Sequence, residues 1–242
     1  MNANVADTLK PRAGKRFQPT KELALHEPAL RACVDIASPR RDLTVVREMT
    51  GPYGIPDFTA IIGGRIDLDA RLACPVPPLL NEIDSAIAAV AHGKAARTAD
   101  SFARSIGWPV TTISRRIPHL FLRSGGLTEI RPGRYVRPEG IRPLGSVVAV
   151  EAKVDDWRQA LRQVRTYTVW ADSYIVVMGS LTGRATEKML GEVGKDGGGL
   201  VVDGSWVLRP HVQPTRERKR RVWAAEHVLA ALRETYQPSP AP

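Results

Sequence analysis

One stretch of this chain constrains its fold more than any other. Residues 146–153 have the sequence SVVAVEAK, an almost unbroken run of apolar and β-branched residues, which is typical of a strand buried inside a sheet. A helical pattern from Asp155 to about Ala171 follows, and then a second apolar run, SYIVVM, at residues 173–178. Two buried strands joined by a helix form a crossover, which makes them parallel. The sequence therefore predicts an α/β fold with a mixed sheet.

Other elements of the sheet are predicted on both sides of this crossover. Leu43–Met49 and residues 55–64 have strand composition, and the turn-forming sequence TGPYG lies between them, which favours a hairpin. Residues 21–36 have helix-forming composition interrupted by Pro28, which predicts one kinked helix or two short ones. Downstream we expect a helix at 183–193, a hairpin within 200–208, and a final helix at 216–236 with a strongly basic start.

The middle of the chain has a different pattern. Three helices are predicted, at 81–94, 98–106 and about 110–123, and LTEIRPGRYVR at 127–137 predicts two short strands around a Pro-Gly turn. Three helices followed by a hairpin is the layout of a winged helix-turn-helix. The predicted organisation is therefore a basic flexible arm at 1–19, a core at 20–75, a winged-helix insertion at 80–140, and the rest of the core at 145–236.

The predicted insertion has the charge of a phosphate-binding module. From Arg104 to Arg137 there are seven arginines and a single acidic residue, Glu129. A helix-turn-helix places its last helix in the major groove, and the wing contacts the backbone. Winged helices also dock proteins, and that alternative stays open. The candidate DNA-binding residues are Thr111, Thr112, Ser114, Arg115 and Arg116 on the third helix, and Arg131 and Arg134 on the wing.

Composition narrows the partners and the compartment. The chain has 35 Lys and Arg against 25 Asp and Glu, a net charge of +10, which attracts phosphate backbones or anionic membrane surfaces. Its two cysteines, Cys33 and Cys74, are too few for a zinc finger and indicate a reducing compartment. No signal peptide or membrane span is predicted, so we expect a cytoplasmic protein without a membrane partner. The basic run at 216–221 suggests phosphate contact or a solvated helix face.

Acidic residues and a lysine occur at two predicted strand ends. Asp57 follows Pro56 where a strand leaves a turn, and Glu151, Ala152 and Lys153 end the apolar strand. Residues two apart on a strand share a face, so the carboxylate and the amine converge, and the Ala152 carbonyl is a third possible metal ligand. Hydrolysis of a phosphodiester needs a divalent cation held by oxygen ligands and an oriented water. Two carboxylates and a lysine can supply both.

This order of elements resembles the PD-(D/E)XK nuclease superfamily. That family runs helix, strand, strand with the aspartate, strand with Glu-x-Lys, helix and parallel strand. The resemblance implies a restriction-endonuclease-like core that uses Mg²⁺ or Mn²⁺, with Asp57 and Glu151 as metal ligands and Lys153 in catalysis. Gln163 and Tyr167 look like the Gln-x-x-x-Tyr feature that some branches carry on the following helix.

Two features of the resemblance stay open. A glutamate on the first helix is common in the family, and Glu27 or Glu22 could supply that metal ligand. Asp57 and Glu151 are 94 positions apart, whereas the family usually joins these strands by a short connection. The winged-helix insertion explains the gap, and the alternative is that Asp67 or Asp69 is the true aspartate.

A Glu-x-Lys triplet by itself is weak evidence. A second triplet starts at Glu217 in a basic run without strand character, and an ion pair at a solvated strand end contributes little to stability. The strand, the upstream Pro-Asp and the crossover together favour a metal-dependent nuclease acting on double-stranded DNA, in which a homodimer stays open. A DNA-binding regulator or assembly factor that does not cut is the alternative, and a nuclease linked to RNA or transposition is a third.

Overall fold

A mixed seven-stranded sheet forms the centre of the molecule in the computed structural model, which describes residues 4–6, 22–37, 41–213 and 217–235. The order is β1-β2-β3-β6-β7-β8-β9. Pairing is antiparallel at β2/β3, β3/β6 and β8/β9, and parallel at β1/β2, β6/β7 and β7/β8. The predicted α/β class with a mixed sheet is confirmed. The strands are β1 Asn4–Ala6, β2 Leu43–Arg47, β3 Phe58–Ile62, β6 Ser146–Lys153, β7 Ser173–Met178, β8 Gly199–Val202 and β9 Ser205–Leu208.

The short edge strand β1 corrects one expectation. The sequence predicted a flexible arm at residues 1–19, but Asn4–Ala6 pairs in parallel with Thr44–Val46 of β2. Most of the predicted arm, residues 1–3 and 7–19, lies outside the described residues, as does the tail from residue 236 onward.

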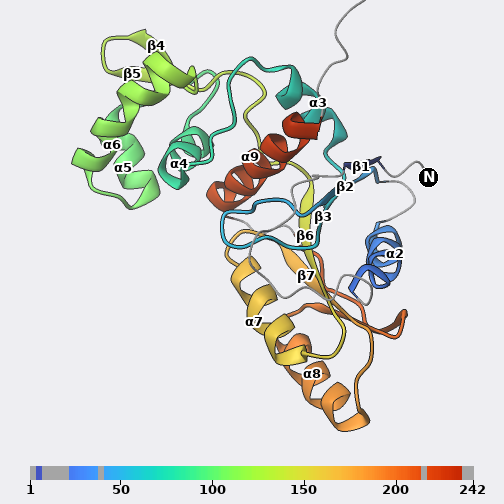
Figure 1. Cartoon of the computed structure of the whole chain (residues 1–242). Helices are drawn as coiled ribbons and strands as arrows, with labels where there is room; N and C mark the ends of the chain where they lie inside the picture. The colour runs from blue at the N-terminus through green and yellow to red at the C-terminus, as the bar shows by residue number, and fades with distance from the viewer. Residues whose placement is uncertain (1–3, 7–21, 38–40, 214–216, 236–242) are drawn as a thin grey trace, which may run out of the picture.

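Helices cover both faces of the sheet (Figure 1). α2, His26–Ile36, packs on one face, where Ala29 and Cys33 join a hydrophobic cluster with Val148 and Val150. α7, Trp157–Tyr167, and α8, Gly183–Lys195, cover the other face. All eight residues of β6 are buried, as expected for a central strand covered on both sides. The predicted crossover from β6 through α7 to β7 is confirmed.

The segment between β3 and β6 leaves the sheet and forms its own hydrophobic cluster around Phe102, Ile113 and Leu120. Thr98 caps one of its helices and Gly107 ends it with a left-handed backbone, which are the positions that threonine and glycine favour. The expected hairpin around Gly133 is also present. The elements are α3 Arg65–Ala73, α4 Glu82–Val90, α5 Ala99–Ile106, α6 Val110–Pro118, the π-helical turn η1 His119–Ser124, β4 Thr128–Arg131 and β5 Arg134–Val136.

Two details of this segment differ from expectation. The third helix does not run unbroken to residue 123, since α6 ends at Pro118 and η1 follows. Proline has no N–H to continue the α-helical ladder, so the chain widens into a π-helical turn. α3 was not predicted; its short apolar face contributes only Leu68 and Leu72 to the core.

The C-terminal helix α9, Arg218–Thr235, packs against α4 of the segment, and it also contacts α3 and β2 (Figure 1). Its basic start makes structural contacts: Lys219 donates to the carbonyl of Ile106 at 3.1 Å and Arg221 to that of Leu144 at 2.8 Å. In the described ranges, no helix is long and apolar enough to cross a membrane.

Candidate functional site

Strand pairing brings Asp57 to the end of β6. β3 and β6 are antiparallel with Phe58 opposite Val150, so the residue before Phe58 comes beside the residues after Val150. Oδ2 of Asp57 accepts a hydrogen bond of 2.7 Å from the backbone N–H of Ala152. Asp57 and the Glu-Ala-Lys triplet are therefore adjacent in space.

The Lys153 amine lies among three oxygen atoms. Its Nζ is 2.9 Å from Oε1 of Glu151, donates to the carbonyl of Ala152 at 3.1 Å, and is 3.8 Å from Oε1 of Glu22. The Glu151 side chain is 1% exposed and that of Lys153 is 9% exposed. The Ala152 carbonyl, expected as a metal ligand, is bonded to this amine.

One residue of α7 contacts this site, and a second lies one turn away from it on the same helix. The Tyr167 hydroxyl donates to Oε2 of Glu151 at 2.8 Å, and Tyr167 is 1% exposed. Gln163 lies one turn earlier, where a spacing of four places it on the same side of the helix. Its Oε1 is buried and has no hydrogen-bond partner among the described residues. Of the expected Gln and Tyr, Tyr167 therefore bonds to the triplet, and Gln163 lies on the same side of α7.

Burial and charge perturb this cluster. Burial, followed by the nearby Asp57 carboxylate, raises the pKa of Glu151 to about 7, against a weaker opposing effect of Lys153. Burial alone would lower the pKa of Lys153, but the carboxylates of Glu151, Asp57 and Glu22 together outweigh it, and the net direction is upward. Lys153 is therefore a cation at neutral pH, held beside a carboxyl that is close to its titration point.

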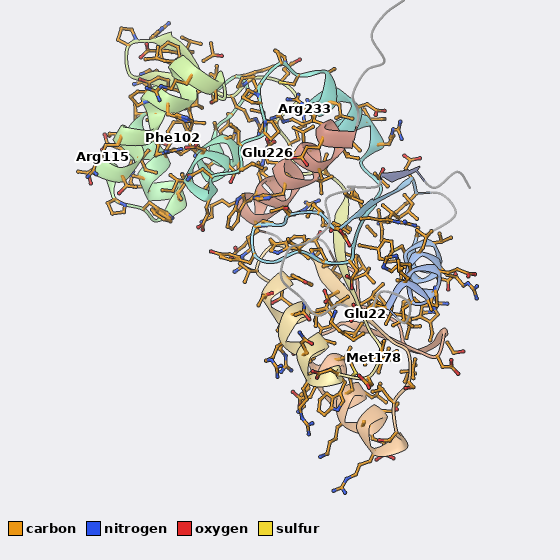
Figure 2. The ribbon with its side chains drawn as sticks, in the orientation of Figure 1. Glu22, Phe102, Arg115, Met178, Glu226 and Arg233 are labelled. Atoms are coloured by element: carbon orange, nitrogen blue, oxygen red, sulfur yellow. The ribbon has the colours of Figure 1, made fainter. Side chains whose placement is uncertain are left out.

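The two glutamates of the first helical region, Glu22 and Glu27, lie in different places. Glu27, which was expected as a metal ligand, is 81% exposed and pairs with Arg31 at 2.8 Å on the surface of α2. Glu22 instead lies 3.8 Å from the Lys153 amine, and Figure 2 places it beside the sheet. Of the two glutamates that the sequence left open, Glu22 is therefore the one that lies near the triplet.

The alternative aspartates lie elsewhere. Asp69 pairs with Arg65 at 3.0 Å along the exposed side of α3, and Asp67 is 3.5 Å from Arg142. Neither joins the cluster at Lys153. Of the aspartates considered from the sequence, Asp57 is the one at the end of β6.

The loop that carries Asp57 packs against α7 and the turn that follows α7. Gly51 donates to the carbonyl of Gly54 at 3.0 Å, and Trp170 Nε1 donates to the carbonyl of Tyr53 at 3.2 Å. Gly54 has a φ of +79°, and a Cβ there would lie 2.8 Å from a ring atom of Tyr167. Only glycine meets both demands, because the backbone is left-handed and the ring lies in close contact.

The predicted DNA-binding residues lie on the segment far from this cluster; Figure 2 shows Arg115 at its outer edge and Glu22 beside the sheet. Thr111, Ser114, Arg115, Arg131 and Arg134 are exposed, and Thr112 is half-buried. Arg116 is partly buried, and its Nε and Nη2 donate to both oxygens of buried Asp84 on α4. That hydrogen bonding raises the Arg116 pKa and fixes the guanidinium against α4, while 31% of the side chain stays exposed.

The donor set fits a magnesium ion. Among the described residues no group of three or more His, Cys, Asp or Glu is placed to hold a metal, but Mg²⁺ in phosphoryl-transfer sites is commonly bound by one or two carboxylates, with waters and substrate phosphate completing the shell. Asp57 and Glu151 are such a pair, and their mutual repulsion, expressed in the raised pKa of Glu151, is relieved by a cation. Comparison with protein-family models, curated proteins and solved structures found no match.

Proposed function

We propose that this protein is a metal-dependent DNA nuclease with a restriction-endonuclease-like core, in which residues 80–140 act as a winged helix that binds duplex DNA. The observation that carries the proposal is the convergence of Asp57, Glu151 and Lys153 at one end of two paired strands, with Tyr167 bonded to the central carboxylate. A mere ion pair at a strand end does not require the aspartate from the neighbouring strand or the tyrosine from α7.

The carboxylates of Asp57 and Glu151 would hold Mg²⁺ or Mn²⁺, which supplies Lewis-acid activation of water and of the scissile phosphate. The chain's own residues do the rest. The Ala152 amide fixes one oxygen of Asp57, and Tyr167 fixes one oxygen of Glu151. Because its pKa is raised, Lys153 keeps its proton and acts as a donor that orients water and stabilises negative charge developing on phosphate.

DNA binding by residues 80–140 is supported by exposed arginines on two adjoining elements. Arg115 lies on α6, and Arg131 and Arg134 flank the turn of the β4–β5 hairpin. Arginines on a helix and on a neighbouring hairpin match the major-groove and backbone contacts of a winged helix. With Arg116 engaged by Asp84, the contact to DNA falls to Arg115 and the hairpin.

One observation favours the alternative of a DNA-binding protein that does not cut. Glu151 and Lys153 are almost fully enclosed, and the Lys153 amine bonds to the Ala152 carbonyl rather than to an open surface. Half-buried Asp57 and partly exposed Glu22 are the groups through which a phosphate would reach the site. A permanently closed site would leave a protein that binds DNA and leaves it intact.

Plasmid cleavage tests the proposal. Wild type is incubated with supercoiled DNA and Mg²⁺, Mn²⁺ or EDTA, beside Asp57→Asn and Lys153→Met. The Asp57→Asn change keeps an acceptor for the Ala152 amide while it removes the charge, so the fold is preserved. Matched controls are Asp69→Asn and Lys195→Met, which change the same residue types in exposed ion pairs.

The expected result is metal-dependent nicking or linearisation in wild type and both controls, and loss of at least about 100-fold in the two site variants. If wild type binds DNA but leaves it uncut with either metal, the non-cutting alternative replaces the nuclease. If the site variants cut as well as the controls, the nuclease centre lies elsewhere.

A further inference from the structure

One face of α9 contacts both the loop that carries Asp57 and the connection that leads into α4. Toward the loop, Nδ1 of His227 lies 2.8 Å from the carbonyl oxygen of Thr50, and the Trp223 ring meets Tyr53 edge-on with centroids 5.6 Å apart. Trp223 and His227 are four residues apart, so they share a side of the helix.

The same short stretch of α9 forms hydrogen bonds with the connection between α3 and α4. Trp223 Nε1 donates to the carbonyl of Leu80 at 2.9 Å, and Oε2 of Glu226 accepts from the N–H of Leu79 at 2.8 Å. Glu226 is fully buried and also receives two hydrogen bonds from Arg71 of α3; Figure 2 shows Glu226 on α9 close to α4. Trp223 therefore contacts the loop with its ring and the connection with its N–H.

On its other side the loop contacts α7 and the turn that follows α7. Trp170 Nε1 bonds to the carbonyl of Tyr53, and the Tyr167 ring lies against Gly54 while its hydroxyl holds Glu151. The loop thus lies between α9, which contacts the segment, and α7, which contacts the second carboxylate. Packed elements of this kind move as units rather than bending continuously.

We propose that Trp223 and His227 are positioning residues: they set the loop that places Asp57 against Glu151, and through Leu80 they link that placement to the position of the 80–140 segment. The catalytic consequence rests on the proposed nuclease function, but the mechanical link does not. Occupation of the segment by duplex DNA then alters the order of the Asp57 loop, and the coupling acts equally in the reverse direction.

The test removes the hydrogen bond between Trp223 and Leu80 and measures the effect on the loop that carries Asp57. Trp223→Phe removes the hydrogen bond to Leu80 and keeps an aromatic ring against Tyr53. Trp206→Phe is the matched control, because it removes another tryptophan N–H bond, the 2.9 Å bond to Asp35, outside this junction. Amide hydrogen exchange is followed in peptides covering residues 48–57 and 74–81, with circular dichroism and thermal melting to establish that both variants are folded.

We expect exchange in the 48–57 peptide to rise about fivefold in Trp223→Phe, the effect of one lost buried hydrogen bond, and to stay at the wild-type rate in Trp206→Phe. Tyr53→Leu provides the reciprocal arm and should raise exchange at 74–81. If Trp223→Phe loosens only 74–81, or Tyr53→Leu only 48–57, the two sides are not linked and the proposal is overturned.

Cleavage provides a second readout that a merely structural role would not move. A positioning residue changes kcat while the Kd for duplex DNA stays within about twofold, so Trp223→Phe should lower kcat alone. If wild type does not cut DNA, the nuclease proposal fails. The exchange experiment still tests whether the Asp57 loop and the connection into α4 are mechanically linked. If Trp223→Phe raises the DNA Kd and leaves kcat unchanged, Trp223 supports the segment and does not position Asp57.

Discussion

Replacing Lys153 with methionine tests the charge arrangement of the site without any assumption about catalysis. The amine lies 2.9 Å from Glu151 and 3.8 Å from Glu22, and the Lys153 side chain is 9% exposed. Methionine keeps most of the apolar stem and removes the only cation that the structure places in this cluster of described residues. Removing one partner of a buried ion pair costs about 3–5 kcal/mol, because the remaining charge is left uncompensated.

The cost should depend on pH, and the sign follows from the pKa of Glu151. That pKa is raised to about 7 in the folded protein from an ordinary 4.5, so folding takes up a proton and stability falls as the pH rises through this range. In wild type the loss of stability with rising pH ends near pH 7, because Glu151 is then ionised in the folded protein. Without the lysine the pKa of Glu151 rises further, so the variant keeps losing about 1.4 kcal/mol for each further pH unit until Glu151 ionises.

The free energy of unfolding is measured by urea denaturation in EDTA at pH 6 and pH 9. We expect Lys153→Met to lie about 1–2 kcal/mol below wild type at pH 6, where Glu151 is neutral in both proteins, and about 3–5 kcal/mol below it at pH 9. Lys195→Met, in an exposed pair, should lose under about 0.5 kcal/mol at both pH values. A gap that is equal at the two pH values, or below about 1 kcal/mol at pH 9, would refute the arrangement.

Three further outcomes follow from the contacts of the described residues. Arg71→Met should lower the free energy of unfolding by about 3–5 kcal/mol, because it strands the buried Glu226 carboxylate, and adding Glu226→Gln should recover part of that loss in urea denaturation. Burial lowers the pKa of His227 below 6.5, so stability should fall as the pH drops below about 6.5, and His227→Asn should flatten this slope. In fluorescence anisotropy with duplex DNA, Arg115→Ala should weaken binding and make the affinity less dependent on salt concentration. Arg116→Ala should mainly lower the melting temperature of the protein, because it removes the arginine that pairs with buried Asp84.

Most of the strands, the β2–β3 hairpin and the parallel β6–β7 pair were predictable because local patterns determine them. The run at 146–153 is apolar at nearly every position, and a strand of this kind needs cover on both faces. The caps of α5 were predictable for the same reason, since Thr98 and Gly107 act within their own turn. α3 was missed because its face toward the core is only two leucines wide, so helical periodicity is weak.

The contacts of the site that could not be predicted from the sequence depend on tertiary geometry. Glu22 lies on the side of the first helical region that faces β6, and Glu27 lies on its exposed side. Pro28 interrupts the helical pattern, so the sequence does not show which side is which. The bond between Arg116 and Asp84 was not predicted because Asp84 lies 32 positions earlier on another helix. No spacing rule connects two such residues, because the crossing of α4 and α6 brings them together.

The long gap between Asp57 and Glu151 is physically consistent with one compact site. Closing a flexible loop of roughly 80 residues instead of a short turn would cost only about 2–3 kcal/mol, because the entropy grows with the logarithm of length. The segment reduces even that cost, since it folds around its own apolar cluster and is tied to α9 by Trp223 and Glu226. Five registered pairs between β3 and β6 then fix the placement of Asp57. The position of Asp57 is therefore set by strand register and by its loop, and the insertion can affect it only through the contacts that reach that loop.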